Sequence, residues 1–115
     1  MEGISAIPFS DWQKLDLRVG KILKAEEIEG ADKLYKIEVD LGKELGKRTL
    51  VAGIKPYYKK EQLKNKSCIV FVNLEPRILK GIESQGMILA AVDERQNKVH
   101  LLCPDKDIEL GSMVK

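Results

Sequence analysis

The sequence is poor in the side chains that most often carry chemistry. Its 115 residues include two cysteines, one histidine and six aromatic side chains. Cys68 and Cys103 lie in apolar runs without the spacing of a zinc or redox motif, and His100 has no partner at metal-ligand spacing. We therefore expect no metal and no other cofactor. Both cysteines are interpreted as buried, inert thiols, and a disulfide between them is the alternative.

Long apolar runs are missing as well. The longest, residues 68–72 and 87–92, are far shorter than the roughly 20 residues that a membrane-spanning helix needs. The chain also does not open with a basic and apolar leader. These absences predict a cytoplasmic protein with no membrane contact.

Recognisable catalytic patterns are absent too. The sequence holds no nucleophile motif, no metal cluster and no glycine-rich loop that would cradle a phosphate, and the segment 64–67 does not supply one. A chain of 115 residues is also too short for a nucleotide-binding domain and a substrate domain together. We expect a single domain over residues 1–115 and no enzymatic activity of its own.

The charges are nearly balanced overall but unevenly placed. Twenty basic and 18 acidic residues give a net charge of +2, yet residues 43–80 contain ten basic side chains against three acidic ones. A locally basic segment can attract phosphates. It can equally be a solvated surface of ion pairs, and charge alone favours this second interpretation.

Alternating apolar residues predict a mainly β protein. The clearest case is residues 35–41, where Tyr35, Ile37, Val39 and Leu41 alternate with polar residues. A helical turn before residue 15 is expected to plug a barrel end with Phe9 and Trp12, and a lysine-rich helix is predicted from Pro56 to Leu63. The predicted strands are 15–25, with a kink at 20–22, then 35–41, 48–54, 68–74 and 87–92, followed by 98–103 and 112–114.

Five strands with one helix between the third and fourth is the element order of an OB-fold, a five-stranded Greek-key barrel. We predict the core barrel over about residues 11–95 and a C-terminal β extension over about 96–115. The connection at 75–86 is long for a compact domain and contains Ile78, Leu79 and Ile82. It is therefore expected to fold onto the barrel.

Four short motifs occur in a fixed order along the chain. They are Leu-Asp-Leu-Arg-Val-Gly-Lys-Ile at 15–22, Gly-Ala-Asp-Lys-Leu at 30–34, Asn-Leu-Glu-Pro-Arg at 73–77 and Ser-Gln-Gly-Met at 84–87. Together they resemble the tRNA-binding domain family. Its members occur as the C-terminal domain or separate β subunit of methionyl-tRNA synthetases, as stand-alone tRNA-binding proteins and in a synthetase accessory protein. The resemblance covers about residues 11–115.

The resemblance implies binding to the outer corner of folded tRNA and no reaction. It also implies a homodimer formed through the C-terminal extension, and a methionyl-tRNA synthetase catalytic chain as partner. In relatives the contacts involve the lysine of Ala-Asp-Lys-Leu and the serine and methionine of Ser-x-Gly-Met. Here these residues are Lys33, Ser84 and Met87.

Each matched residue also has a simpler interpretation. Lys33 follows an exposed turn, from which an ammonium can reach a phosphate, but it can also be an ordinary solvated lysine. Ser84 and Gln85 suit a ribose hydroxyl or a phosphate, and Met87 can pack on a base or ribose. The alternative is a tight turn feeding a strand, with Met87 in the core.

Three further residues extend the candidate site along the long connection. Arg77 and Lys80, with Asn73 at the end of the preceding strand, are predicted to form a basic rim beside the Ser-Gln-Gly-Met turn. Their alternative is structural, with ion pairs to Glu75 or Glu83. The complete candidate tRNA site is Lys33, Asn73, Arg77, Lys80, Ser84, Gln85 and Met87.

The few aromatic side chains bear on how RNA would be recognised. Tyr35 is in phase with the buried face of its strand, which leaves Tyr57 and Tyr58 as candidates to stack on bases. So few aromatic rings available for stacking favour recognition of the shape of tRNA over readout of its bases. A peptide-binding chaperone of the same fold, acting through an apolar dimer cleft, is the alternative function.

Overall fold

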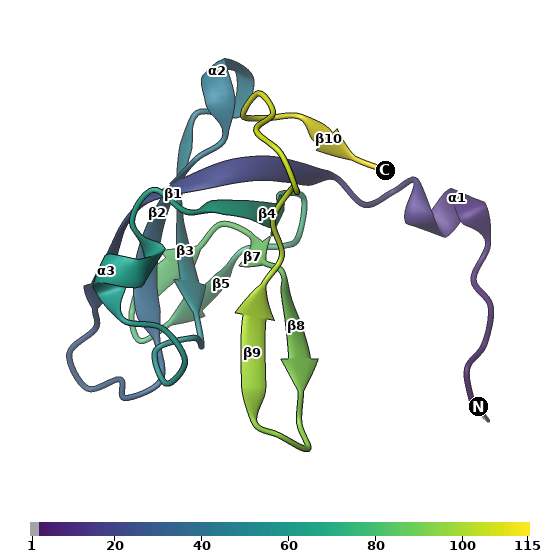
Figure 1. Ribbon diagram of the computed structural model, residues 1–115. Coiled ribbons are helices and arrows are strands. Elements are labelled where there is room, and N and C mark those ends of the chain that lie inside the picture. Colours follow the sequence, from purple (N-terminus) through teal and green to yellow (C-terminus); the bar gives the residue numbers. More distant parts are fainter. Residues whose placement is uncertain (1–2) are drawn as a thin grey trace.

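Residues 3–115 are described by the computed structural model (Figure 1), and within them lie three one-turn helices and ten strands. The helices are α1 Phe9–Trp12, α2 Gly42–Leu45 and α3 Lys60–Leu63. The strands are β1 Leu17–Glu27, β2 Tyr35–Asp40, β3 Lys47–Ala52, β4 Ser67–Phe71, β5 Arg77–Leu79, β6 Ile82–Ser84, β7 Met87–Ile88, β8 Ala90–Asp93, β9 Lys98–Leu101 and β10 Met113–Val114.

Five antiparallel strands form a nearly closed barrel in the order β3-β2-β1-β4-β7. Strand β1 lies at the centre and also pairs with β10, where Leu17 faces Val114. The main-chain N–H of Gln85, just before β7, donates to the carbonyl of Thr49 in β3 at 2.9 Å, which brings the two outer strands together. The prediction of an all-β OB-fold is confirmed.

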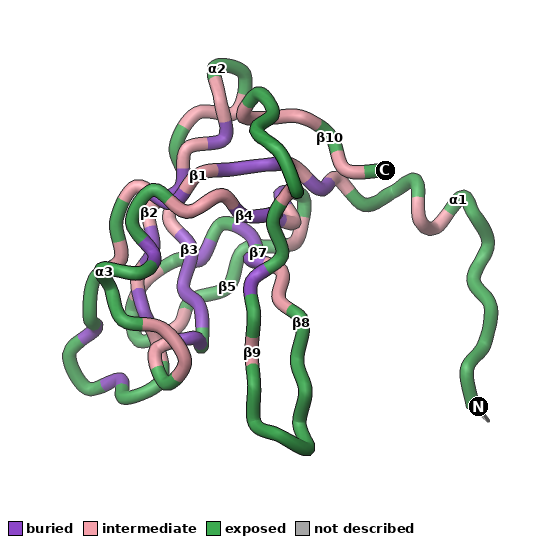
Figure 2. The backbone as a smooth tube through the Cα atoms, in the orientation of Figure 1, coloured by how far each residue is buried: buried purple, intermediate pink, exposed green. Residues whose placement is uncertain are grey.

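The alternation of apolar and polar residues explains which side chains form the core. In β2, Tyr35, Ile37 and Val39 are buried inside the barrel, while the residues between them are half exposed. A second apolar cluster covers the outer face of the sheet around Leu17 and Ile69. Figure 2 shows that the buried backbone follows the barrel strands, whereas the β8–β9 hairpin and the N-terminal segment are exposed.

Two features of β1 differ from the prediction. The strand begins at Leu17 rather than at residue 15, because Leu15 is 38% exposed and pairs with no strand. The irregularity lies between Ile22 and Lys24, where the register with β2 shifts, and not at Gly20. A Cβ on Gly20 would come within 2.9 Å of Leu41 Cδ2, so this glycine serves close packing.

The prediction that the N-terminal aromatics plug the barrel was wrong. The helical turn exists as α1, but Phe9 is 69% exposed and Trp12 packs on the outer cluster with Leu17. Figure 1 shows α1 beyond the end of the barrel, near β10. The predicted helix from Pro56 is also shorter: the Ile54 carbonyl first accepts the N–H groups of Tyr57 and Tyr58, and α3 begins at Lys60. Helix α2 was not predicted.

The apolar run at 87–92 is two strands rather than one. Strand β7 pairs with β4, and Phe71 faces Met87. Strand β8 leaves the barrel and pairs with β9, where Ala90 faces Leu101 at one end and Asp93 faces Lys98 at the other. The resulting hairpin projects from the barrel (Figure 1). The hairpin includes residues on both sides of residue 95, where the boundary between the core barrel and the C-terminal extension was predicted.

The long connection after β4 folds as predicted. It forms the β5–β6 hairpin, which packs on the barrel through Leu79 and Ile82. These two side chains contact a third apolar cluster made by Ile28, Ala31 and Val51. Ile78, on the other face of the hairpin, is 74% exposed.

The two cysteines differ in environment. Both are free, but Cys68 is buried and Cys103 is exposed, so the prediction of two buried thiols was wrong for Cys103. Burial, together with the charge of the Cys103 thiolate, raises the pKa of the Cys68 thiol to about 12, against a weaker opposing hydrogen bond from Gly20. The neutral thiol therefore stabilises the fold below its ordinary pKa of 9.0, and that stabilisation is lost as the pH rises towards 12.

We expect a water-soluble disulfide reagent to modify one thiol per chain in the native protein and two after unfolding in guanidinium. The reason is that Cys103 is exposed to the reagent, whereas Cys68 is buried and burial raises the pKa of its thiol. The release of the coloured leaving group measures this. Cys103→Ser is the control and should leave no fast thiol; a fast reaction in that variant would contradict the assignment.

Candidate nucleic-acid interface

The third apolar cluster brings two distant loops together. Leu34, at the end of the β1–β2 loop, packs against the same cluster as Leu79 and Ile82 of the β5–β6 hairpin. Lys33 and Lys80, which are 47 positions apart in the chain, therefore lie on neighbouring loops at one side of the barrel.

Lys33 is held by its main chain and leaves its ammonium exposed. Its carbonyl accepts the N–H of Lys55 at 3.3 Å, which joins the loop to the segment after β3. Its side chain forms no ion pair with any residue between 3 and 115. The ammonium is therefore available to an external anion.

Arg77 and Lys80 are exposed on the β5–β6 hairpin. The predicted alternative of ion pairs with Glu75 or Glu83 is not formed within residues 3–115. Lys80 and Gly81 make the two-residue turn, with φ of +51° and +79°. These signs are those of a type I′ turn, which normally favours asparagine over lysine at its first position. The turn presents the Lys80 ammonium at the tip of the hairpin.

Met87 lies at the surface rather than in the core. Its side chain is 45% exposed, and with Arg77 and Leu79 it borders a small hollow of about 60 Å³. The structure therefore excludes the core alternative for Met87. A flexible apolar side chain beside an arginine can contact a ribose or base while the guanidinium contacts a phosphate.

Ser84 and Gln85 both accept hydrogen bonds from β3, Ser84 from a buried position and Gln85 from an exposed one. Ser84 is 5% exposed, and its hydroxyl accepts the N–H of Val51 at 2.9 Å and donates to the carbonyl of Gly86 at 3.1 Å. The Gln85 side-chain oxygen accepts the N–H of Thr49 at 3.0 Å. Two edge amides of β3 are thus paired by side chains, so both residues close the barrel.

Gly86 permits this closure. Its φ is +139°, and a Cβ there would lie 2.7 Å from the carbonyl oxygen of Phe71. Only glycine adopts such a backbone without strain. The turn between β6 and β7 consequently depends on it.

Asn73 also has a structural role. Its side-chain oxygen accepts the N–H of Asp16 at 2.8 Å, and its amide nitrogen donates to the carbonyl of Lys14 at 2.7 Å. The side chain therefore fixes the chain entering β1 against the chain leaving β4. Arg77, Lys80, Met87 and Lys33 remain the candidate residues with free functional groups.

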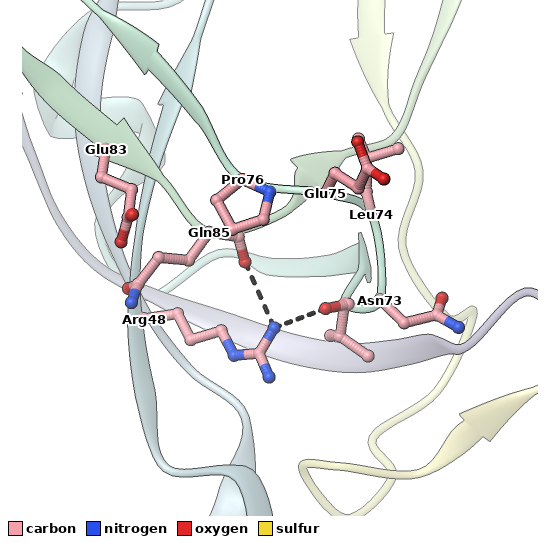
Figure 3. A pocket seen from close by; sticks show the side chains of 8 residues that line it. Arg48, Asn73, Leu74, Glu75, Pro76, Glu83 and Gln85 are labelled. Carbon is pink, nitrogen blue, oxygen red and sulfur yellow. Dashed lines mark hydrogen bonds between the residues drawn. The ribbon is translucent and has the colours of Figure 1, made fainter.

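Arg48 belongs to this region, although sequence reasoning did not select it. Its Nη1 donates to the carbonyls of Val72 at 2.6 Å and Gln85 at 3.2 Å, and so ties β3 to both ends of the long connection (Figure 3). It borders a cavity of about 440 Å³ that Glu75 and Glu83 also line. The carboxylates make this cavity better suited to a hydroxyl than to a phosphate. Nothing in the residue spacing could have identified it.

Two side chains of the lysine-rich segment form ion pairs within the protein. Lys55 and Lys60 approach Glu27 at 3.2 and 3.9 Å. The hydrogen bond from Lys55, with the charges of both lysines, lowers the pKa of the Glu27 carboxyl. For these two lysines the ion-pair interpretation is confirmed.

Tyr35 is a core residue, as predicted. It is 4% exposed, and its hydroxyl donates to the carbonyl of Tyr58 at 2.7 Å. It therefore offers no ring face to a base.

Residues 3–115 contain no group of three histidine, cysteine or acidic side chains placed to hold a metal ion. No helix in this part of the chain is long and apolar enough to cross a membrane.

Known proteins resemble the chain over most of its length. The family model of the putative tRNA-binding domain matches residues 17–113. The methionine–tRNA ligase of Pyrococcus horikoshii is 57% identical over 109 residues, which is 95% of this chain and 14% of the ligase. That of Caldanaerobacter subterraneus is 50% identical over 113 residues, 98% of this chain and 17% of the ligase. The chain thus spans about one seventh to one sixth of these relatives.

Solved structures share the complete fold. A protein related to methionyl-tRNA synthetase from Pyrococcus horikoshii superposes with a TM-score of 0.89 at 36% identity, covering 97% of this chain and 100% of that one. The CsaA chaperone of Bacillus anthracis gives 0.87 at 31% identity, covering 96% and 100%. The motifs, the barrel and the family match agree, and the chain belongs to the putative tRNA-binding domain family.

Proposed function

We propose that this domain binds folded tRNA, without catalysis, on behalf of a methionyl-tRNA synthetase in the cytoplasm. The observation that carries the proposal is the group of free cations Lys33, Arg77 and Lys80 on two neighbouring loops of a tRNA-binding family barrel. The similarity to methionine–tRNA ligases supports the choice of enzyme. The domain would act as a C-terminal domain, a β subunit or a stand-alone protein.

The site chemistry favours shape over sequence. Lysine and arginine contacts to phosphates position an RNA but carry no base information. We assign Lys33 and Lys80 to phosphates, Arg77 to a phosphate or ribose, and Met87 to a ribose or base face. Asn73, Ser84 and Gln85 contribute by holding the loops that present these groups.

The ligase reaction is assigned to a catalytic part outside these residues, in the same polypeptide or in a partner chain. The chain corresponds to only 14% of the Pyrococcus horikoshii ligase. Holding tRNA close to such a part raises its effective concentration at the active site without any new chemistry.

A salt titration tests the tRNA proposal. Binding of folded tRNA should be detectable at 50 mM salt, and log K should fall linearly with log salt with a slope of about −2 to −3, since three cations displace counterions. Filter binding or fluorescence anisotropy measures the slope, and an unfolded single strand of matched length is the control. Failure to retain tRNA at low salt would contradict the proposal.

A homodimer is the arrangement that we propose for this binding. Exposed apolar side chains gather on the C-terminal part of the chain, where Val92, Leu102, Ile108 and Met113 are 42 to 63% exposed. Phe9 adds to Met113 at a shared groove. A twofold pairing through these surfaces would bury them and double the RNA-binding area.

Light scattering at micromolar concentration should report twice the chain mass. Met113→Glu places a charge in the proposed contact and should give a monomer, whereas the solvent-exposed control Lys106→Glu should not. A wild-type monomer under these conditions would overturn the dimer.

A peptide-binding chaperone role is the second candidate. A groove of about 360 Å³, bordered by Phe9, Trp12, Leu15, Met113 and Val114, offers an apolar surface, and CsaA chaperones share the fold. Such binding would depend weakly on salt and would compete with dimer formation at Met113. The salt titration therefore separates the two functions.

A further inference from the structure

Another hollow lies between the segment 56–66 and the strand β9. Its volume is about 630 Å³, and its walls are the residues around α3 on one side and residues 97–101 of the β8–β9 hairpin on the other. None of these residues belongs to the group formed by Lys33, Arg77, Lys80 and Met87. The hollow therefore needs its own explanation.

Two lysines give the hollow its positive charge. Lys66, Lys98 and His100 line it, and none of its described lining residues is acidic. Neither lysine forms an ion pair within residues 3–115. In a chain whose charges nearly balance, a hollow with cations and no carboxylate favours an anionic ligand.

Two tyrosine rings line the same hollow, and both are fixed. The Tyr58 hydroxyl accepts the N–H of Leu101 at 3.0 Å, and the Lys66 ammonium lies 5.9 Å from the centre of its ring. The Tyr57 hydroxyl donates to the Asn97 side-chain oxygen at 2.9 Å, which connects the hairpin tip to the segment before α3. Both rings are half-buried, so each keeps some accessible surface.

The two hydrogen bonds hold the walls in place before any ligand arrives. A preorganised site loses less conformational entropy on binding. An aromatic face beside cationic groups is the combination that nucleic-acid-binding proteins use for a stacked base and its phosphate.

We propose that this hollow binds one nucleotide unit, with its base against Tyr57 and its phosphate at Lys66 and Lys98. The unit can come from the RNA held by the main interface or from a free mononucleotide. The first source rests on the proposed tRNA-binding function, and the second does not.

The test has two arms, one with a free mononucleotide and one with RNA. In the mononucleotide arm, the ¹⁵N-labelled 115-residue chain is titrated with AMP, adenosine and inorganic phosphate, and its amide signals are followed by NMR. AMP should shift the amide signals of Asn97, Lys98 and His100, and should do so at lower concentration than adenosine or phosphate alone. Lys98→Ala should raise the apparent Kd for AMP about threefold or more. The exposed Lys106→Ala is the matched control and should leave it unchanged.

The RNA arm measures folded tRNA binding by the same variants. Lys66→Ala and Lys98→Ala should each reduce the salt slope by about one unit, so with this hollow occupied the wild-type slope should be steeper than the roughly −2 to −3 that the three interface cations give alone. Tyr57→Leu should weaken binding about fivefold or more through lost stacking, whereas Tyr57→Phe keeps the ring and should stay within about twofold. Thermal melting shows whether each variant is folded.

The outcomes separate this proposal from the main one. Effects in the RNA arm alone identify the ligand as a nucleotide of bound RNA, and effects in the AMP arm alone identify a free nucleotide. If neither arm responds while Lys33→Gln still weakens tRNA binding, the hollow is not a nucleotide site and the main function stands. If wild-type protein binds no tRNA but AMP shifts Lys98, the main function falls and the hollow remains.

Discussion

Replacing the three free cations together, as Lys33→Gln, Arg77→Gln and Lys80→Asn, is expected to weaken tRNA binding about a hundredfold at low salt. The estimate takes about 1 kcal/mol for each lost contact. The dependence of log K on log salt should also flatten by about two to three units, because fewer counterions are released. Anisotropy titrations at several salt concentrations measure both effects.

A matched variant distinguishes a site from general charge attraction. Lys24→Gln, Lys43→Gln and Lys106→Gln remove the same charge from exposed positions. None of them lines the hollow beside Met87 or the hollow between the segment 56–66 and β9. This control should lose no more than about threefold in affinity, since these lysines lie outside the proposed contact and act on the RNA only through charge that the solution screens. Equal losses in both variants would contradict a localised interface.

The substituted site should remain folded. Lys80 has a φ of +51°, and asparagine tolerates this left-handed conformation better than lysine. The three side chains are exposed and make no ion pair in the described part of the chain. Thermal unfolding of the triple variant should therefore match the wild type or exceed it slightly.

A large loss of stability is expected from Gly86→Ala. The new Cβ would lie 2.7 Å from the Phe71 carbonyl oxygen at a φ of +139°, so neither the backbone nor the contact can relax cheaply. We expect a destabilisation of about 3 kcal/mol or more. For a domain of this size, that lowers Tm by roughly 10 to 20 °C.

Gly53→Ala is the control for this experiment. Gly53 has no positive φ, and a Cβ there would meet nothing closer than Leu34 Cδ2 at 3.8 Å. Its Tm should change by only about 2 °C. Circular dichroism melts of the two variants give the comparison, and equal Tm values would show that the turn at residue 86 can rearrange.

Local patterns allowed most of the barrel to be predicted. The alternation at 35–41 depends only on residues in one strand, and the strand appears as expected at Tyr35–Asp40. The run at 87–92 was misjudged because its second half pairs with β9, so that Val92 is 63% exposed in a projecting hairpin. An apolar run alone does not reveal which partner strand a residue will meet.

The structural roles of two candidate site residues were not predicted, for the same reason. Lys33, Arg77, Lys80 and Met87 are exposed as a contact residue should be, but Ser84 and Gln85 bond to amides of β3 that lie 33 and 36 positions away. A short polar residue in a turn looks the same in a sequence whether it faces solvent or a strand edge. Arg48 was overlooked because its partners, Val72 and Gln85, are 24 and 37 positions away in the chain.

The closure of the barrel has a consequence for how this fold can change over evolutionary time. Main-chain pairing between strands survives most substitutions, because nearly every residue supplies the same N–H and C=O groups. Between β3 and the turn before β7, however, a hydroxyl and a carboxamide satisfy two of the strand amides. Drift at positions 84 and 85 can therefore loosen or tighten one side of the barrel while every strand keeps its length and register.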